Sequence, residues 1–436
     1  MKLPPNWAMA PLRTLGTWSG GGTPSKQVAA FWNGEIPWVS PKDMKVPRIS
    51  DTEDHITTDA IEQSAAALVR RGSVLVVTRS GILRHSLPVA VADRDVTLNQ
   101  DLKALTVADG LVPEYVAWAV RRFDRMILST CAKSGTTVQN LETARLLDFE
   151  IPVAPMAEQR RIVAAIEEYL SRLDSAAESL DRAKRRLARL RTSTISAAVT
   201  GAWPPVALGE VTESQIYGSS AKANTDVTGV PILRMGNIRD GALDFDELKY
   251  LPADHADVEK CRLEPGDLLF NRTNSPELVG KSAVFKRGPD PTVFASYLIR
   301  VRLTRECNPD WAALVINSQL GRRYVATVRT QQVGQANVNG TKLAAMPIPL
   351  PPVEEQRRII QDVEHELSLI DAMGAEIDKA LRRSAALRRT ILDQAFSGKL
   401  VPQDPSDEPA SVLLDRIAAE RATAPKPSRR KRKIPA

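Results

Sequence analysis

Polar side chains that could hydrogen-bond to nucleic acid gather in several short loops of the sequence. Arg, Lys, Asn, Gln and Ser can form bidentate hydrogen bonds to base edges or contact phosphates. The loops hold twelve candidates: Ser40, Lys42, Arg79, Arg84, Lys133, Arg234, Asn237, Asn271, Arg272, Asn274, Arg329 and Gln331. Polar loops are commonly just solvated, so each residue alone is weak evidence and only the set favours a nucleic-acid contact.

Motifs of enzyme active sites are missing from the sequence. There is no glycine-rich S-adenosylmethionine loop with an (Asn/Asp)-Pro-Pro-aromatic tetrapeptide, and no HExxH, GxSxG or PD…ExK pattern. Residues 280–282 resemble the end of a phosphate-binding loop, but Ser275 stands where that loop requires glycine. The four histidines and three cysteines lack ligand spacing. We therefore expect no catalytic residue, no metal site and no cofactor in this chain.

The charge of the chain is concentrated at its end. The 436 residues carry a net charge of +7, but residues 425–436 hold six Lys and Arg and no acid, which leaves 53 basic and 52 acidic residues elsewhere. The basic end reads as a disordered tail, which could add nonspecific attraction to phosphates. No signal peptide or membrane-spanning run is evident, so a cytoplasmic location is expected.

A long internal repeat organises the sequence. Residues 140–201 align with residues 337–398 without a gap, and 23 of the 62 pairs are identical. Weaker similarity at an offset of 194 relates residues 36–39 to residues 230–233 and residues 72–76 to residues 266–270. The chain is therefore a tandem duplication in which the segments before each repeat have diverged further than the repeats themselves.

Each repeated segment predicts a long helix, within residues 151–201 and 348–400. Proline and glycine are absent from residues 156–200, and only Gly374 interrupts residues 353–397. At 1.5 Å per residue, about 45 residues span about 65–70 Å, longer than a compact domain. We expect the two helices to pair within the chain as an antiparallel coiled coil. An intermolecular coiled coil or packing against the domains remains open.

Heptad spacing indicates which residues should face the partner helix. In the first helix the predicted positions are Ile166, Leu173, Leu180, Leu187 and Thr194, with Tyr169, Ala176, Ala183, Leu190 and Ala197 three residues later. The aligned positions of the second helix are Val363, Ile370, Ile377, Ser384 and Ile391, with Glu366, Met373, Ala380, Leu387 and Gln394.

Residues 1–150 and 202–347 read as two mixed domains. Strands are expected at residues 74–78, 88–92, 267–270, 282–285 and 298–303, and helices at residues 114–123 and 311–316. Each domain is interpreted as an α+β unit with one small sheet. Residues 401–436 form a C-terminal tail.

These features together resemble a known family. The Ile-Pro and Glu-Gln-Arg-Arg-Ile elements of residues 151–162, repeated at 348–359 before a second long helix, are similar to the specificity subunit of type I restriction–modification systems. Residues 19–25, 36–39, 266–272, 395–402 and 407–414 are also similar, while residues 198–201 depart from the family's usual helix ending.

The resemblance implies a fold and a set of partners. It implies an α+β chain of two similar α/β target-recognition domains, separated by two long antiparallel coiled-coil helices with pseudo-twofold symmetry. Each domain would read one half of a bipartite site in double-stranded DNA. The helices would set the spacing and dock two methyltransferase subunits, which bind S-adenosylmethionine and methylate adenine. Restriction subunits that use ATP and Mg²⁺ could join as a pair, and the chain itself would be non-catalytic and act away from membranes.

The docking residues are expected where the repeated motif opens each helix. They are Glu158, Gln159, Arg160, Arg161, Glu355, Gln356, Arg357 and Arg358. Two other interpretations stay open at this point. The chain could be the recognition module of another DNA-modifying assembly, or a coiled-coil scaffold that binds no DNA.

Overall fold

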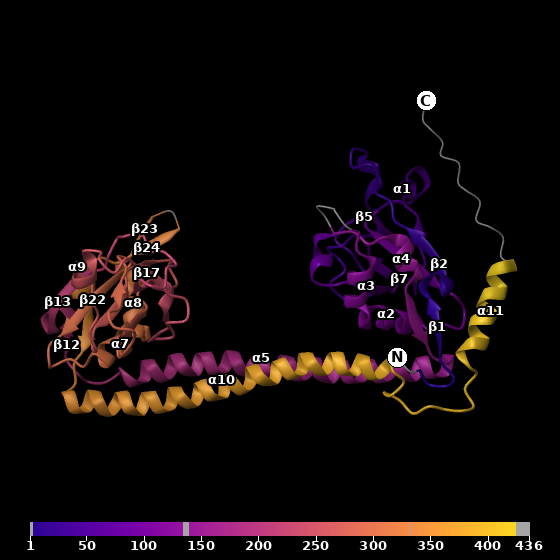
Figure 1. Ribbon diagram of the computed structural model, residues 1–436. Helices are drawn as coiled ribbons and strands as arrows, with labels where there is room; N and C mark the ends of the chain where they lie inside the picture. The colour runs from indigo at the N-terminus through magenta and orange to yellow at the C-terminus, as the bar shows by residue number, and fades with distance from the viewer. Residues whose placement is uncertain (1–2, 134–138, 333, 424–436) are drawn as a thin grey trace. The chain divides into compact units, whose positions relative to one another are not determined.

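Two compact units make up the computed structural model, which describes residues 3–133, 139–332 and 334–423. The first unit contains Met1–Glu178 and Leu381–Ala436, and the second contains Ser179–Ala380. Each unit therefore holds one mixed domain and a part of both long helices (Figure 1). Among the described residues, no helix is long and apolar enough to cross a membrane.

Among the residues that the structure describes, the domain of the first unit contains three sheets. The largest has the order β2-β10-β7-β8-β4, a second has the order β5-β3-β9-β6, and β1 pairs with β11. The strands are β1 (Ala8–Pro11), β2 (Gly16–Gly20), β3 (Trp32–Val39), β4 (Arg48–Ile49), β5 (His55–Ile56), β6 (Leu68–Val69), β7 (Val74–Val77), β8 (Val89–Ala92), β9 (Val96–Leu98), β10 (Leu102–Val107) and β11 (Glu150–Val153). Because β11 leads directly into a long helix, the β1–β11 pair closes the domain at the helix start.

Short helices complete the first domain. They are η1 (Leu12–Thr14), η2 (Ala29–Phe31), α1 (Thr58–Gln63), η3 (Gly81–Arg84), α2 (Pro113–Arg122), α3 (Asp124–Cys131) and α4 (Thr143–Asp148). A further helix, α11 (Ala410–Thr423), comes from the end of the chain and packs on β1 and η1. Buried side chains of α2, β7, β8 and β10 form the main core, which Leu413 and Ile417 of α11 extend.

The domain of the second unit repeats this plan with shorter strands. Its sheets have the orders β13-β22-β18-β20, β17-β14-β21, β19-β24-β23, β12-β25 and β15-β16. The strands are β12 (Pro205–Ala207), β13 (Thr212–Tyr217), β14 (Val230–Leu233), β15 (Ile238–Arg239), β16 (Ala242–Leu243), β17 (Lys249–Leu251), β18 (Leu268–Asn271), β19 (Thr273–Asn274), β20 (Ser282–Val284), β21 (Val293–Phe294), β22 (Leu298–Leu303), β23 (Thr330–Gln332), β24 (Gln335–Asn337) and β25 (Pro347–Pro349).

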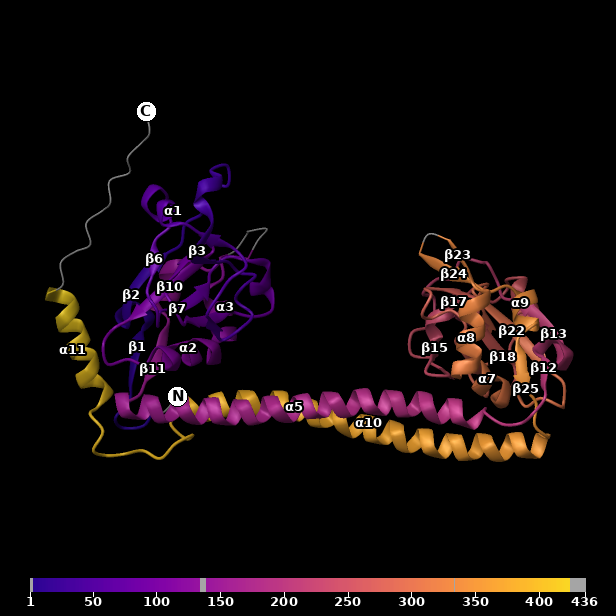
Figure 2. The ribbon, with the colours of Figure 1, turned by 180° about the vertical axis from the view of Figure 1, so that it is seen from behind.

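Some helices of the second domain lie at the repeat offset from helices of the first, whereas η2 and η3 have no counterpart among the described residues. The helices of the second domain are η4 (Leu208–Val211), η5 (Met235–Asn237), α6 (Asp257–Lys260), α7 (Pro309–Asn317), α8 (Gln319–Val328) and α9 (Gly340–Ala344). In both units a parallel strand pair, β3–β9 and β14–β21, lies in a mixed sheet that also contains antiparallel pairs. Figure 2 shows both domains from the opposite side.

The predicted strands and helices of both domains are confirmed, but the prediction of one small sheet per domain is wrong. The strands β7, β8, β18, β20 and β22 and the helices α2 and α7 lie where the sequence placed them. The described residues of each domain contain at least three sheets. Hydrophobic patterning identifies a strand but not its partner, and here short strands separated by turns pair in different sheets.

The two long helices, α5 (Met156–Ala198) and α10 (Val353–Ala395), run antiparallel within each unit. In the second unit, Lys184 pairs with Asp378 and Arg191 pairs with Asp371, so numbers rise on α5 as they fall on α10. In the first unit, Arg388 of α10 pairs with Asp174 of α5. This is the same pair as Arg191–Asp371, displaced by the repeat offset.

Burial follows the first of the two predicted heptad stripes more closely than the second. Ile166, Val363 and Ile370 of the first stripe are buried, as expected. In the second stripe Tyr169 is 42% exposed, while the next residue, Leu170, is 8% exposed. At this turn the buried position therefore comes one residue later than predicted, whereas Leu190 and Met373 of the second stripe line a hollow together with Leu187 and Ile377. A straight helix has 3.6 residues per turn, so the buried stripe drifts from strict heptad spacing.

Candidate nucleic-acid interface

Three chain segments meet at one end of β7 in the first unit. The backbone N–H of Thr78 donates to the carbonyl of Asp101 at 2.8 Å, and the N–H of Leu141 donates to the carbonyl of Thr78 at 2.8 Å. Arg79 forms a β-bridge with Asn140. We call these segments, residues 78–80, 99–101 and 139–141, the polar edge of the first unit.

The same three segments meet in the second unit. The N–H of Arg272 donates to the carbonyl of Tyr297 at 2.9 Å, and the N–H of Val338 donates to the carbonyl of Arg272 at 2.9 Å. Thr273 pairs with Asn337 in the β19–β24 ladder. Residues 272–274, 295–297 and 336–338 are therefore the polar edge of the second unit. Arg272 corresponds to Thr78, and Thr273 corresponds to Arg79.

The polar edges bring together half of the predicted contact residues. In the first unit Arg79 lies at the edge, and the N–H of Lys133 donates to the carbonyl of Asn140. In the second unit Arg272 and Asn274 lie at the edge, and Gln331 pairs through its backbone with Ala336. The side chain of Gln331 lies outside the described residues, as do residues 134–138, the rest of the predicted loop after Lys133.

The arginines of the edges differ in their partners. Arg79 Nε donates to Asp101 Oδ1 at 2.6 Å. Arg329, next to the second edge, donates from Nη1 to the carbonyl of Pro276 at 2.6 Å. The guanidinium of Arg272 stacks instead on the ring of Tyr217, with its central carbon 4.8 Å from the ring centre. Only the first of these charges is matched by a carboxylate at the edge.

Two predicted contact residues, Ser40 and Asn237, instead build an equivalent turn in each unit. After β3, Ser40 N–H donates to Asp43 Oδ2 at 2.8 Å. After β14, Arg234 N–H donates to Asn237 Oδ1 at 2.9 Å. Ser40 and Asn237 are buried, and Arg234 occupies the position of Ser40. The side chains of Asn237 and Asp43 stabilise their own loops, which counts against a base contact by Asn237.

Three further predicted residues have local roles or lie apart from the edges. The carboxylates of Glu53 and Asp54 bind the Lys42 ammonium and raise its pKa above the ordinary lysine value. Asn271 is fully buried, and its Nδ2 points to the carbonyl of Leu278. Arg84 is exposed at the end of η3. Burial excludes Asn271 from direct contact in this arrangement.

The repeated motif at the helix starts works mainly within the chain, which corrects part of the predicted docking surface. Gln159 is fully buried: its Oε1 accepts from the N–H of Val112 at 3.0 Å, and its Nε2 donates to the carbonyl of Ala154 at 2.8 Å. Its helix is thereby fixed to the start of α2. Buried polar side chains keep such positions only when they are hydrogen-bonded.

Gln356 makes the same connection in the second unit. Its Oε1 accepts from the N–H of Asn308 at 2.8 Å, at the start of α7, and its Nε2 donates to the carbonyls of Pro351 and Glu306. The side chain is fully buried. We call the two arrangements glutamine clamps. Neither Gln159 nor Gln356 is available to a partner protein, because each amide is already bonded to backbone groups.

Glu158 and Arg161 hold the end of the chain against the first unit. Glu158 is 1% exposed and accepts from Trp7 Nε1 at 3.0 Å and from Gln403 Nε2 at 2.5 Å. Burial raises the pKa of this carboxyl. Arg161 pairs with Asp407 at 2.6 Å. The predicted docking role of Glu158 is therefore wrong in this arrangement, since the side chain is enclosed.

The remaining motif residues lie at the surface. Arg160, Arg357 and Arg358 are exposed, and Glu355 is partly exposed. Arg357 pairs with Glu354 at 2.6 Å, and Arg358 lies 3.8 Å from Glu355. These four residues remain open to a partner, because exposed pairs of this kind are weak.

A cation joins each domain to its long helix, which the sequence reasoning missed. In the first unit Arg48 lies 2.8 Å from Glu114 of α2 and 3.7 Å from Glu167 of α5. In the second unit, Lys286 lies 3.2 Å from Asp310 of α7 and 3.0 Å from Glu364 of α10.

The acidic residues of these ion pairs lie at equivalent positions in the two units, whereas the basic residues do not. Glu167 and Glu364 differ by the repeat offset of 197, and Glu114 and Asp310 differ by 196. Arg48 is the first residue of β4, whereas Lys286 follows β20. A search for acids at the repeat offset could have found the acidic half of each bridge.

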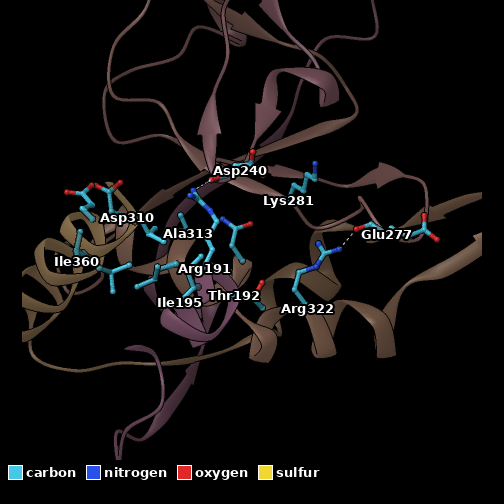
Figure 3. A pocket seen from close by; sticks show the side chains of 16 residues that line it. Arg191, Thr192, Ile195, Asp240, Glu277, Lys281, Asp310, Ala313, Arg322 and Ile360 are labelled. Carbon is cyan, nitrogen blue, oxygen red and sulfur yellow. Dashed lines mark hydrogen bonds between the residues drawn. The ribbon is translucent and has the colours of Figure 1, made fainter. Parts of the chain in front are cut away.

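A cavity of about 350 Å³ lies in the second unit, between the long helices, α7 and the turn at Asp240 (Figure 3). Arg191 reaches across it and donates to the carbonyl of Asp240 at 3.1 Å, while Arg322 donates to the carbonyl of Glu277. A cavity in the first unit is lined by residues at equivalent positions, including Glu167, Leu170 and Arg388. Among the described residues, no group of His, Cys, Asp or Glu is placed to hold a metal ion.

Comparison with known proteins identifies the family. The sequence profile described as "Type I restriction modification DNA specificity domain" matches residues 4–185 and 201–373, most of the chain. The chain belongs to this family. Its two specificity domains are the duplicated halves described above, and its role is DNA sequence recognition within a type I restriction enzyme.

Curated relatives extend over the whole chain. The chain is 25% identical over 457 aligned residues to the EcoKI specificity subunit of Escherichia coli strain K12, covering 97% of each sequence. It is 26% identical to the StySPI specificity subunit of Salmonella potsdam, again with 97% of each covered.

Solved structures share the fold. A chain from a structure titled "Structural basis underlying complex assembly and conformational transition of the type I R-M system" has a TM-score of 0.74 at 20% identity, covering 92% of this chain and all of that one. The HsdS subunit from Thermoanaerobacter tengcongensis has a TM-score of 0.58 at 19% identity, covering 92% of this chain and 98% of that one. These two likenesses show that the chain shares its fold with both structures.

Proposed function

We propose that each specificity domain reads one half of a bipartite site in double-stranded DNA. The observation that carries this proposal is the pair of polar edges. Their backbones are hydrogen-bonded in the same way, yet Thr78 and Asp101 of the first edge are replaced by Arg272 and Tyr297 in the second. A shared framework with different side chains suits the reading of two different sequences, because base edges are distinguished by side-chain donors and acceptors.

The long helices set the spacing between the half-sites and dock two methyltransferase subunits in this proposal. Support comes from Arg160 and Arg357, which are exposed at equivalent positions of α5 and α10. A surface that occurs twice in one chain is suited to two copies of the same partner. Those partners would bind S-adenosylmethionine and methylate adenine.

Restriction subunits that use ATP and Mg²⁺ would join the same complex, as a pair where they are present. The chain would itself be non-catalytic and would hold no cofactor. It would act on DNA in the cytoplasm.

Mapping of adenine methylation in the source DNA tests the proposal. We expect one bipartite methylated motif, which disappears when the gene for this chain is deleted and returns when it is restored. Co-purification of a subunit that binds S-adenosylmethionine provides the matching biochemical result. Methylation that is unchanged by the deletion, with no such subunit co-purifying, would contradict the proposal.

An insertion in the long helices tests their role as a spacer. Equal insertions of whole helical turns in α5 and α10 should change the gap between the half-sites and leave both half-sites unchanged. The methylated motif of the insertion variant provides the measurement. An altered half-site sequence at a constant gap would show that the helices do not set the spacing.

A further inference from the structure

The strand registers identify one further difference between the two units, next to the polar edges. Lys103 of β10 faces Gly20, and the corresponding Ile299 of β22 faces Tyr217. Tyr217 therefore replaces Gly20, just as Arg272 replaces Thr78. The second edge thus gains an aromatic ring and a guanidinium at neighbouring positions on one framework.

Tyr217 is held in a fixed orientation at this edge. Its backbone belongs to β13, and its hydroxyl oxygen accepts from the N–H of Gly340 at 2.8 Å. The ring is nevertheless 42% exposed, and nearby Tyr297 is 45% exposed. The guanidinium of Arg272 stacks on the fixed ring of Tyr217, with 4.8 Å between its central carbon and the ring centre. Stacking of this kind restricts the plane of the guanidinium.

The hydrogen-bonding capacity of Arg272 is largely unused within the chain. Nη1 lies 3.5 Å from the carbonyl oxygen of Ser296, and the buried Nε has no hydrogen-bond partner. No carboxylate among the described residues lies within ion-pair distance of Arg272, whereas Arg79 at the first edge is bound to Asp101. An arginine that is oriented but not neutralised is suited to an external acceptor.

We propose that Arg272 reads a guanine in the half-site recognised by the second unit, with Tyr217 as its positioning residue. Guanine presents O6 and N7 side by side in the major groove, and the planar fork of an arginine bonds both. In this proposal Tyr217 holds the guanidinium of Arg272 in one plane. Two parallel N–H donors then favour the two acceptors of guanine over the donor and acceptor of adenine. This inference rests on the proposed function of the chain.

The test measures methylation by the assembled complex on DNA duplexes in which each base pair of the half-sites is changed in turn. Arg272→Ala should reduce discrimination by about 10- to 100-fold at a single G·C pair of one half-site. Arg272→Lys keeps the charge but loses the fork, and should lose most of the same discrimination. The other half-site should be unaffected in both variants.

Variants of Tyr217 separate a positioning role from a structural one. Tyr217→Phe keeps the ring and should retain most of the discrimination. Tyr217→Ala should weaken it at the same base pair as Arg272→Ala, by a smaller factor. A merely structural residue would lower methylation of all duplexes equally, so the base-specific readout distinguishes the two roles.

Arg287→Ala provides a matched control for the lost charge. Arg287 is exposed and follows β20, whose pairing with β18 places it at the end of that strand remote from Arg272. This variant should discriminate as the original chain does. Thermal unfolding of all variants checks that each is folded.

Three results would overturn the inference. Discrimination that is unchanged in Arg272→Ala would exclude a base contact. A uniform loss over all duplexes would indicate a phosphate contact, and relaxation at an A·T pair would exclude guanine. If the original chain directed methylation to no bipartite site, the proposed function itself would be contradicted. That outcome can be told apart from a failure of the inference about Arg272.

Discussion

The two units differ in their side chains far more than in the backbone contacts that place those side chains. Both have a polar edge of three segments, a turn closed by Asp43 or Asn237, and a glutamine clamp at the helix start. What differs is the set of side chains presented at the edge. The comparison teaches that, after the duplication, the contacts that position the edges were retained, whereas the side chains that the edges present diverged.

A second difference concerns the end of the chain. In the first unit Glu158 binds Trp7 and Gln403, and α11 buries Leu413 against the domain. In the second unit the equivalent Glu355 lies near Arg358, and the described residues provide no counterpart of α11. The first domain is therefore built from both ends of the chain, whereas the second is built from one continuous stretch.

The largest expected effect comes from exchanging the first domain. Replacing residues 1–150 together with 396–436 by those of another family member should change one half-site completely and leave the other half-site and the gap unchanged. The tail is included because α11 packs on β1 and η1. Methylome mapping of the chimera measures the result.

Keeping the original tail provides the control for this exchange. Such a chimera should be less stable, since Leu413 fits closely against Gly110, where an added Cβ would lie 2.6 Å from its side chain. A change in both half-sites would contradict the modular interpretation.

Removing the apolar anchor of α11 should affect the first unit alone. Leu413 is 1% exposed, so Leu413→Ala should lower the free energy of unfolding of the first unit by about 3 kcal/mol. Hydrogen exchange in the full chain should show faster exchange in β1 and unchanged exchange in β13. Val412→Ala, at a residue that is 47% exposed, provides the control. Equal loss in both units would refute the difference between them.

The glutamine clamps give a paired prediction. Gln356→Ala leaves three backbone groups without their partner and should cost about 2–3 kcal/mol in the second unit, while Gln159→Ala leaves two and should cost about 2 kcal/mol in the first. Denaturant unfolding, with hydrogen exchange to assign each unit, measures both. Exposed Arg357→Ala should change little. If both variants lost less than about 0.5 kcal/mol of unfolding free energy, water would be replacing the hydrogen bonds of the glutamine side chains.

The smallest expected effect belongs to the repeated ion pairs of the long helices. Arg191–Asp371 and Arg388–Asp174 are partly exposed, so neutralising either pair should cost less than about 1 kcal/mol. Double-mutant cycles on each pair at low and high salt provide the measurement. A coupling energy above about 2 kcal/mol in either pair would mean that the helices depend on it.

The long helices could be predicted from the sequence because helix-breaking residues are almost absent from them. Residues 156–200 contain no proline or glycine. Helix α10 tolerates Gly374, where an added Cβ would meet no atom within 4 Å outside its own stretch of helix. Gly398, just after the end of α10, has a φ of +71°, in the left-handed region where glycine commonly ends a helix. The second stripe was predicted only in part, as Tyr169 and Leu170 show, because heptad spacing does not reveal how far a straight helix pair drifts from it.

The polar edges could be predicted only in part. As arginines in polar loops, Arg79 and Arg272 indicated a contact surface. The burial of Asn271 and the hydrogen bond from Asn237 to the backbone depend on the three-dimensional arrangement and could not be predicted. Gln159 and Gln356 were assigned to partner docking because they belong to the repeated motif that opens each helix, and the sequence does not reveal that their amides bond to backbone groups. The turn could have been recognised from Ser40 and Asp43, which repeat as Arg234 and Asn237 at an offset of 194.

The glutamine clamps carry a consequence for how such chains evolve. Gln159 and Gln356 bind only backbone groups of their domains, and every non-proline residue offers the same N–H and C=O groups whatever its side chain. A domain can therefore mutate, or be inherited from another strain by recombination, without any matching change in the helix that carries it. New specificities can arise in one domain while the glutamine clamp is inherited unaltered.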